Sequence, residues 1–224
     1  MLIKGDTLLF TGDSITDTGR VRDDATAQEN ADGWGYANIL KAMLLHDYAN
    51  LGLTIYNRGI SGNRIVDLYA RAKEDCYNLR PSVVSVLIGI NDLWAEFKRG
   101  TGVEITKFDR VYDMMLAELR ERLPNVRIVL MEPFSLPGGL PDVDDYEDWR
   151  RQLSARQVIV HDLANSYNAI FVPLQPAFDA ACRLAPDTYW LYDGVHPTAP
   201  GHMLIANAWQ QAWRQAVLKE SVLS

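Results

Sequence analysis

Five short apolar segments alternate along this chain with longer segments whose apolar residues recur at helical spacing. The apolar segments span residues 7–12, 54–57, 83–88, 126–131 and 169–172. The third is apolar on both faces, which is typical of a parallel strand that is buried on both sides. Strands that alternate with helices form a parallel sheet with helices on both faces. We therefore expect a five-stranded parallel α/β sheet, and 224 residues fit one such domain over residues 1–224.

The segments between these strands divide into helices and loops. Helical spacing predicts helices over residues 34–47, 64–79, 107–123, 145–167, 175–184 and 201–218. Polar, proline-containing or glycine-containing stretches predict loops over residues 18–32, 132–144 and 185–200. Loops of this length inside a compact domain are often functional, so we expect parts of a functional site in them.

The first three predicted strands each end in a turn of glycine and polar residues. These turns are Gly12-Asp13-Ser14, residues 59–63 and residues 89–92. Parallel strands point the same way, so all three turns lie at one edge of the sheet. Ligands of open parallel α/β sheets bind outside that edge, beyond the carboxyl ends of the strands. The turns therefore predict a site to which Ser14 contributes.

Ser14 has the position of a nucleophile, although Gly-Asp-Ser is also an ordinary composition for a helix start. A serine hydroxyl is a good nucleophile only when a base takes its proton, and at neutral pH that base is usually histidine. His196 lies in a predicted loop, three residues after Asp193, whose carboxylate can orient the imidazole ring. The other histidines lie within or at the start of predicted helices: His46, His161 and His202. The sequence therefore favours His196 as the base and Asp193 as the residue that orients it.

A nucleophilic serine also needs hydrogen-bond donors for the negative charge that develops on the substrate oxygen. The backbone N–H of Ser14 is free to donate at a helix start. The backbone N–H of Gly62 and the side-chain amide of Asn91 lie in the second and third turns. Taken singly, each is more ordinary as a turn residue. Together with a nucleophile and a base, they predict an oxyanion hole made by Ser14, Gly62 and Asn91.

Four segments of the chain resemble the ordered blocks of the SGNH (GDSL-type) hydrolases. They are Gly12-Asp13-Ser14, the turn at Gly62, Gly89-Ile90-Asn91-Asp92 and Asp193-Gly194-Val195-His196. The serine, glycine, asparagine and histidine of the family name match Ser14, Gly62, Asn91 and His196. The resemblance implies a flavodoxin-like, three-layer α/β/α sandwich. It also implies esterase chemistry without a metal or cofactor, with Asp193 completing a catalytic triad.

A narrower resemblance is to the intracellular xylan acetylesterase branch of that family. Residues 12–20, 57–63, 88–94 and 195–203 carry it. It implies removal of acetyl groups from xylo-oligosaccharides and a tendency to form homo-oligomers. Aromatic faces suit sugar rings, although buried core aromatics would have the same composition. We expect substrate contacts from Asp13, Trp94, Trp190 and Tyr192, with Tyr189 beside them.

Two other functions remain open beside this serine esterase of short acyl esters. A lysophospholipase or acyl-thioesterase of the same fold needs a long apolar groove, and the sequence has no obvious lid segment to line one. A sugar-binding protein without activity would keep the fold, but every catalytic block is intact. The rates of hydrolysis of acetate esters and of longer acyl esters distinguish these three functions.

Composition limits the partners and the compartment. The net charge is −7 and the pI about 5.1, which disfavours nucleic acid and anionic membranes as partners. No stretch approaches the ~20 apolar residues of a membrane span. Cys76 and Cys182 have no metal-site spacing and favour unpaired thiols in a reducing compartment, although a disulfide between them stays open. With no signal peptide visible after Met1, we expect a cytoplasmic protein.

Trp209 and Trp213 on the last helix suggest either core packing or an oligomer contact.

Overall fold

The protein is a five-stranded parallel sheet with helices on both faces, as a computed structural model describes it. The structure describes residues 2–22, 31–138, 140 and 146–223. The strands are β1 (Thr7–Gly12), β2 (Thr54–Gly59), β3 (Val83–Leu87), β4 (Arg127–Met131) and β5 (Ile170–Val172). Their order in the sheet is β2-β1-β3-β4-β5, and all pairs are parallel. The expected three-layer α/β/α fold is confirmed.

The helices have the following bounds. They are α1 (Ser14–Asp17), α2 (Tyr36–Asp47), α3 (Ile65–Asp75), α4 (Ile90–Arg99), α5 (Ile105–Arg122), α6 (Tyr146–Ser166), α7 (Gln175–Ala181), α8 (Asp187–Trp190) and α9 (Ala199–Leu223). Short 3-10 turns follow α2 and α3 at Ala49–Leu51 and Tyr77–Leu79. None of the helices in the described ranges is both long enough and apolar enough to cross a membrane.

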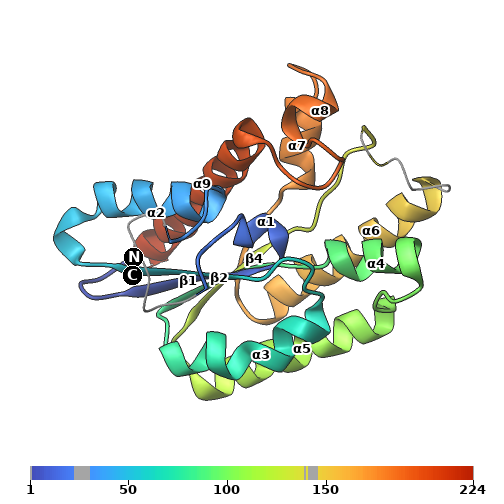
Figure 1. Cartoon of the computed structure of the whole chain (residues 1–224). Coiled ribbons are helices and arrows are strands. Elements are labelled where there is room, and N and C mark those ends of the chain that lie inside the picture. The colour runs from blue at the N-terminus through green and yellow to red at the C-terminus, as the bar shows by residue number, and fades with distance from the viewer. Residues whose placement is uncertain (1, 23–30, 139, 141–145, 224) are drawn as a thin grey trace.

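The two faces of the sheet are covered by different helices, and Figure 1 shows α2 and α9 on one face and α3 and α5 on the other. Alternation along the strands produces this division, because successive strand residues point to opposite faces. In β1, Leu8 and Phe10 belong to the core cluster under α2 and α9, while Leu9 belongs to the cluster under α3 and α5. The sheet is therefore buried on both faces.

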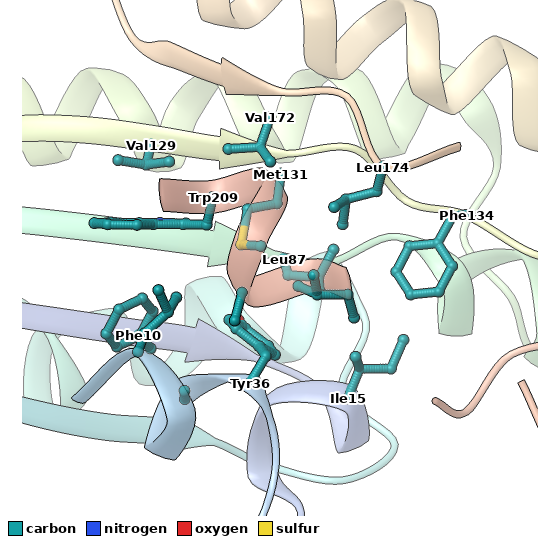
Figure 2. Close-up of a cluster of buried hydrophobic side chains, with 14 of the residues drawn as sticks. Phe10, Ile15, Tyr36, Leu87, Val129, Met131, Phe134, Val172, Leu174 and Trp209 are labelled. Carbon is teal, nitrogen blue, oxygen red and sulfur yellow. The ribbon is translucent and has the colours of Figure 1, made fainter. Parts of the chain in front are cut away.

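Trp209 and Trp213 lie in the first of these clusters and are 0% and 2% exposed. Their rings stack 5.3 Å apart, and the Trp209 indole N–H donates to Ser85 Oγ in β3 at 3.0 Å. Figure 2 shows this cluster running from Phe10 and Trp209 over the strands to Ile15 beyond the strand ends. Of the two roles expected for these tryptophans, core packing is therefore the observed one, and they provide no surface for an oligomer contact.

Several expected boundaries were wrong or incomplete. Helices α4 and α8 fall in segments that we did not predict as helical, and β2 extends two residues beyond the expected end. The expected loops over residues 18–32 and 132–144 lie partly outside the described residues, as does the expected helix start at residue 145. The last helix begins two residues earlier than expected, at Ala199.

The strand order reverses direction at β1, whose neighbours are β2 and β3. In open α/β sheets the crevice beyond the carboxyl ends of the strands at such a reversal is where ligands bind. Helix α1 follows β1 directly at this edge, so the fold brings Ser14 to the crevice.

Candidate active site

Ser14 is the first residue of α1 and lies in a tight connection from β1. A Cβ atom at Gly12 would lie 2.1 Å from the Leu87 carbonyl oxygen, so only glycine allows β1 and β3 to approach this closely. Asp13 caps α1, because its Oδ1 accepts a hydrogen bond from the Ile15 N–H at 2.9 Å. The Ser14 N–H has no acceptor among the described residues. The connection therefore holds the Ser14 hydroxyl and N–H at the sheet edge.

The structure joins Ser14, His196 and Asp193 by hydrogen bonds. Ser14 Oγ lies 2.8 Å from His196 Nε2, across 182 positions of sequence. His196 Nδ1 lies 2.7 Å from Asp193 Oδ2. The other carboxylate oxygen of Asp193 accepts the backbone N–H groups of Val195 and His196 at 3.1 and 2.7 Å. One loop therefore fixes both the imidazole and the carboxylate.

The protonation state of Asp193 decides the tautomer of His196. Burial alone would raise the pKa of Asp193, but the hydrogen bonds from the His196 ring and backbone outweigh it and hold that pKa below its usual value. An ionised carboxylate only accepts hydrogen bonds, so His196 Nδ1 carries the proton that Asp193 receives. His196 Nε2 is then an acceptor for the Ser14 hydroxyl. This arrangement can deprotonate a serine.

Two further donors lie in the turns after β2 and β3. Gly62 has a φ of +82°, which favours glycine, and its N–H has no acceptor among the described residues. Asn91 lies in the first turn of α4, and its side-chain Nδ2 donates to the Asn63 carbonyl at 3.1 Å. That contact uses one of the two amide hydrogens and leaves the other for a ligand.

Asp17 ties the α1 segment to the Gly62 turn. Its Oδ2 accepts hydrogen bonds from the backbone N–H and the hydroxyl of Ser61, at 2.9 and 2.8 Å. It also accepts one from Arg22 at 3.0 Å. The nucleophile turn and the second turn are therefore held in one register.

A cavity of about 210 Å³ opens beside Ser14 and His196. Trp34, Ser61 and Tyr192 line it, and so does the buried His202. Sequence reasoning missed Trp34, Ser61 and His202 as lining residues. His202 Nδ1 accepts the Tyr36 N–H at 3.2 Å, and the Trp34 ring meets the His202 ring edge-on at 5.0 Å. Burial lowers the pKa of His202 to about 4, so it is neutral near pH 7.

The residues expected to contact substrate have different places. Tyr192 lines the cavity and stacks on the His196 ring at 5.6 Å, and the Trp94 ring lies 5.7 Å from that of His196. Trp190 packs against the core cluster and does not line this cavity. Asp13 does not line this cavity either, because its side chain is 0% exposed and caps α1.

Two buried carboxyls lie behind the site. Burial raises the pKa of Asp13 to about 7, and its Oδ2 has no hydrogen-bond partner among the described residues. Burial also raises the pKa of Asp92 to about 7, although both of its oxygens accept the Ile65 N–H, at 3.0 and 3.2 Å. Asp92 thereby joins the start of α3 to the first turn of α4, which carries Asn91.

Metal-ligand clusters and reactive thiols are two further features that could contribute chemistry. Within the described ranges, three or more His, Cys, Asp or Glu side chains do not meet in a cluster that could hold a metal ion. Cys76 and Cys182 are both free thiols, which answers the question of their pairing. Burial raises the pKa of both, to about 12 and about 11, so neither is a ready thiolate.

Comparison with known proteins gives consistent matches over most of the chain. Residues 10–204 match the model of the GDSL-like Lipase/Acylhydrolase family. An acetylxylan esterase from Geobacillus stearothermophilus is 36% identical over 206 residues, which are 91% of this chain and 92% of that protein.

Solved structures agree with these sequence matches. A GDSL-like lipase from Parabacteroides merdae has a TM-score of 0.90 and 40% identity, covering 95% of this chain and 97% of its own. The crystal structure of the Geobacillus stearothermophilus acetylxylan esterase has a TM-score of 0.84 and 33% identity, covering 94% of each chain. The chain therefore belongs to the GDSL-like lipase/acylhydrolase family and is a carboxylic ester hydrolase.

Proposed function

We propose that this esterase removes acetyl groups from acetylated xylo-oligosaccharides, with Ser14 as nucleophile, His196 as general base and Asp193 as the residue that orients it. The observation that carries the proposal is the hydrogen-bonded series from Asp193 through His196 to Ser14. Similar proteins add support: catalytic mutants of the Geobacillus stearothermophilus enzyme each replace a serine, a histidine or an aspartate by alanine. We treat residues 1–224 as one catalytic domain.

In the first half-reaction Ser14 Oγ attacks the acetyl carbonyl carbon while His196 Nε2 takes the hydroxyl proton. The carbonyl oxygen gains negative charge. The backbone N–H groups of Ser14 and Gly62 and the side-chain amide of Asn91 stabilise this charge by donating hydrogen bonds. The tetrahedral intermediate then collapses. The bond from the acetyl carbon to the sugar oxygen breaks, and His196 gives its proton to that oxygen. The sugar then leaves with a free hydroxyl group at that position.

In the second half-reaction water attacks the acetyl group on Ser14. His196 Nε2 takes a proton from that water, and the same three donors stabilise the negative charge on the carbonyl oxygen. The acetyl–Ser14 bond breaks, and Ser14 regains a proton from His196. Acetic acid leaves and releases its remaining acidic proton to solvent to become acetate. Throughout, Asp193 stabilises the imidazolium that forms in each step.

The packing beside Ser14 favours a short acyl group. The residues that line the cavity there include Ile15 and His202, which are only 2% and 1% exposed. Side chains packed this tightly do not yield space for a long chain without a repacking cost. A lysophospholipase or thioesterase would need that space.

The rim of the cavity favours a sugar. Trp34 and Tyr192 are each 57% exposed and both line the cavity, so their rings are open to a ligand. Aromatic side chains give a large contact area with a polar edge, which suits a ring that carries hydroxyl groups. Trp94, beside His196, is a further contact that we propose for the substrate.

The test compares ester substrates on one enzyme preparation. We expect kcat/KM to be highest for p-nitrophenyl acetate, to fall steeply for the octanoate, and acetate to be released from acetylated xylo-oligosaccharides. Ser14→Ala is the control for contaminating esterases and should reduce turnover to background. Preference for the octanoate would favour the lysophospholipase or thioesterase function. Turnover that survives Ser14→Ala would refute the assignment of the nucleophile.

We also propose a cytoplasmic homo-oligomer. Two free cysteines suit a reducing compartment. Exposed apolar side chains near α8 and the start of α9 suit contact between copies, namely Leu184, Tyr189 and Met203. Light scattering at micromolar protein should give a mass above 25.3 kDa, and a monomer mass would contradict the oligomer.

A further inference from the structure

The guanidinium of Arg71, on α3, connects three segments at the carboxyl edge of the sheet. Its Nη2 donates to the Gly12 carbonyl at 3.0 Å, and its Nη1 to the Arg58 carbonyl at 2.8 Å. Its Nε donates to the side-chain oxygen of Asn63 at 2.6 Å. The carboxylate of Asp75, one helical turn away, holds Nη1 at 2.6 Å. The side chain of Arg71 is only 14% exposed, so these contacts lie mostly out of water.

Two of the acceptors of Arg71, Gly12 and Asn63, lie next to the proposed catalytic groups. Gly12 ends β1 two residues before Ser14. Asn63 follows Gly62 directly, and the carbonyl of the same Asn63 accepts the side-chain amide of Asn91 at 3.1 Å. One guanidinium therefore reaches the nucleophile segment and, through Asn63, both turns that supply oxyanion donors.

We propose that Arg71 is a positioning residue that holds the Gly62 and Asn91 donors in register with Ser14. This inference rests on the proposed function. Oxyanion donors contribute to the rate only if they already point at the place where the negative charge develops. A displacement of about 1 Å caused by a change away from the reacting atoms can cost ~10²-fold in rate.

The chemistry of the guanidinium explains why arginine suits this position. Its planar group presents five N–H donors in a fixed fork, which matches acceptors that lie in different directions. A lysine keeps the positive charge but offers one compact ammonium, which cannot meet the Gly12, Arg58 and Asn63 oxygens in the same way. Arg71→Lys therefore tests the geometry while it preserves the charge.

A second arginine provides a matched control at the opposite edge of the sheet. Arg120, on α5, donates to the Val126 carbonyl and, at 2.7 Å, to the Tyr167 carbonyl. These carbonyls precede β4 and β5, so they lie at the amino edge of the sheet, away from Ser14. Arg120→Lys removes the same kind of clamp without touching the proposed site.

The experiment measures kcat, KM and urea unfolding for the wild type, Arg71→Lys, Asn63→Ala and Arg120→Lys, with p-nitrophenyl acetate. We expect kcat to fall about 10–100-fold in Arg71→Lys, with KM within about threefold of the wild type. Asn63→Ala breaks the same contact from the other side and should show the same kcat loss, so it replaces Arg71→Lys if that variant does not fold. Arg120→Lys should keep the wild-type kcat even if its free energy of unfolding is lower.

A cycle with Asn91→Ala tests whether Arg71 acts through the proposed donors. With the Asn91 amide removed, Arg71→Lys should lower kcat by a smaller factor than in the wild type. The same factor in both backgrounds, or an equal kcat loss in Arg120→Lys, would overturn the proposal. If Ser14→Ala is inactive and Arg71→Lys keeps full kcat, the positioning role fails and the proposed function stands. If Ser14→Ala remains active, the proposed function itself fails.

Discussion

The stability of Asp13→Asn relative to the wild type should rise with pH. Asp13 is 0% exposed, its Oδ1 caps α1, and its Oδ2 has no partner among the described residues. Burial raises its pKa from 3.8 to about 7. Asparagine keeps an oxygen for the cap and carries no charge, so Asp13→Asn removes the pH-dependent cost of burying a carboxylate. Its amide nitrogen takes the place of the unpartnered Oδ2, and the cost of burying that nitrogen does not change with pH.

The sign and size of the effect follow from proton linkage. Between pH 3.8 and about pH 7 the folded wild type holds a proton on Asp13 that the unfolded chain has released, so the free energy of unfolding falls as the pH rises. Each pH interval of one costs about 1.4 kcal/mol in this range, which gives about 2–3 kcal/mol between pH 5 and pH 8. For a chain of this size the corresponding change in melting temperature is about 5–10 °C.

The assay is urea unfolding of the wild type and Asp13→Asn at pH 5 and at pH 8. We expect the variant to gain stability over the wild type by about 2–3 kcal/mol more at pH 8 than at pH 5. Asp17→Asn is the matched control. Burial alone would raise the pKa of Asp17, but hydrogen bonds from Ser61 and Arg22 outweigh it and lower that pKa below 3.8. Its loss of stability should therefore be the same at both pH values. A difference in the free energy of unfolding between Asp13→Asn and the wild type that does not change with pH would refute the reasoning.

Three further outcomes are expected. Asn91→Ala should lower kcat by ~10²–10³ with little change in KM, because its amide acts mainly on the transition state; steady-state kinetics would contradict this with a pure KM effect. Trp34→Ala should raise KM several-fold for acetylated xylo-oligosaccharides but not for p-nitrophenyl acetate. Met114→Ala, which changes an exposed side chain on α5 outside the cavity lining, should change neither KM. Trp209→Phe should lower the free energy of unfolding by about 1–3 kcal/mol in urea, since it loses packing and the bond to Ser85, and should leave kcat unchanged.

The sheet could be predicted because its strands are encoded locally. Apolar runs such as residues 83–88 stand out by composition alone, and their alternation with helices determines the parallel arrangement. Helix α4 was not predicted, although Ile90, Leu93 and Phe97 have helical spacing, because its first residues belong to the glycine and polar turn at residues 89–92, a composition typical of a loop. Helix α8 has only four residues, too few for a periodic pattern.

The candidate site was predictable where a residue type declares its chemistry. Ser14, His196 and Asp193 lie together as expected, at 2.8 and 2.7 Å, while their catalytic roles stay predictions. The complete burial of Asp13 could not be read from the sequence, because it depends on how the whole core closes around β1. Trp34 likewise lines the cavity beside His202, and this contact between residues far apart in the sequence could not be read from local patterns.

The separation of 182 positions between Ser14 and His196 has a consequence for synthesis of the enzyme. A nascent chain that ends before His196 already carries the serine and all three proposed oxyanion donors, yet it has no base to activate the hydroxyl. The loop that supplies His196 leads directly into α9, whose Trp209 docks on Ser85 in the centre of the sheet. With the roles proposed above, a chain that ends before His196 lacks the base, so it cannot hydrolyse ester by this route. Recovery of activity during refolding therefore requires contact between two distant parts of the chain, and not only formation of the sheet.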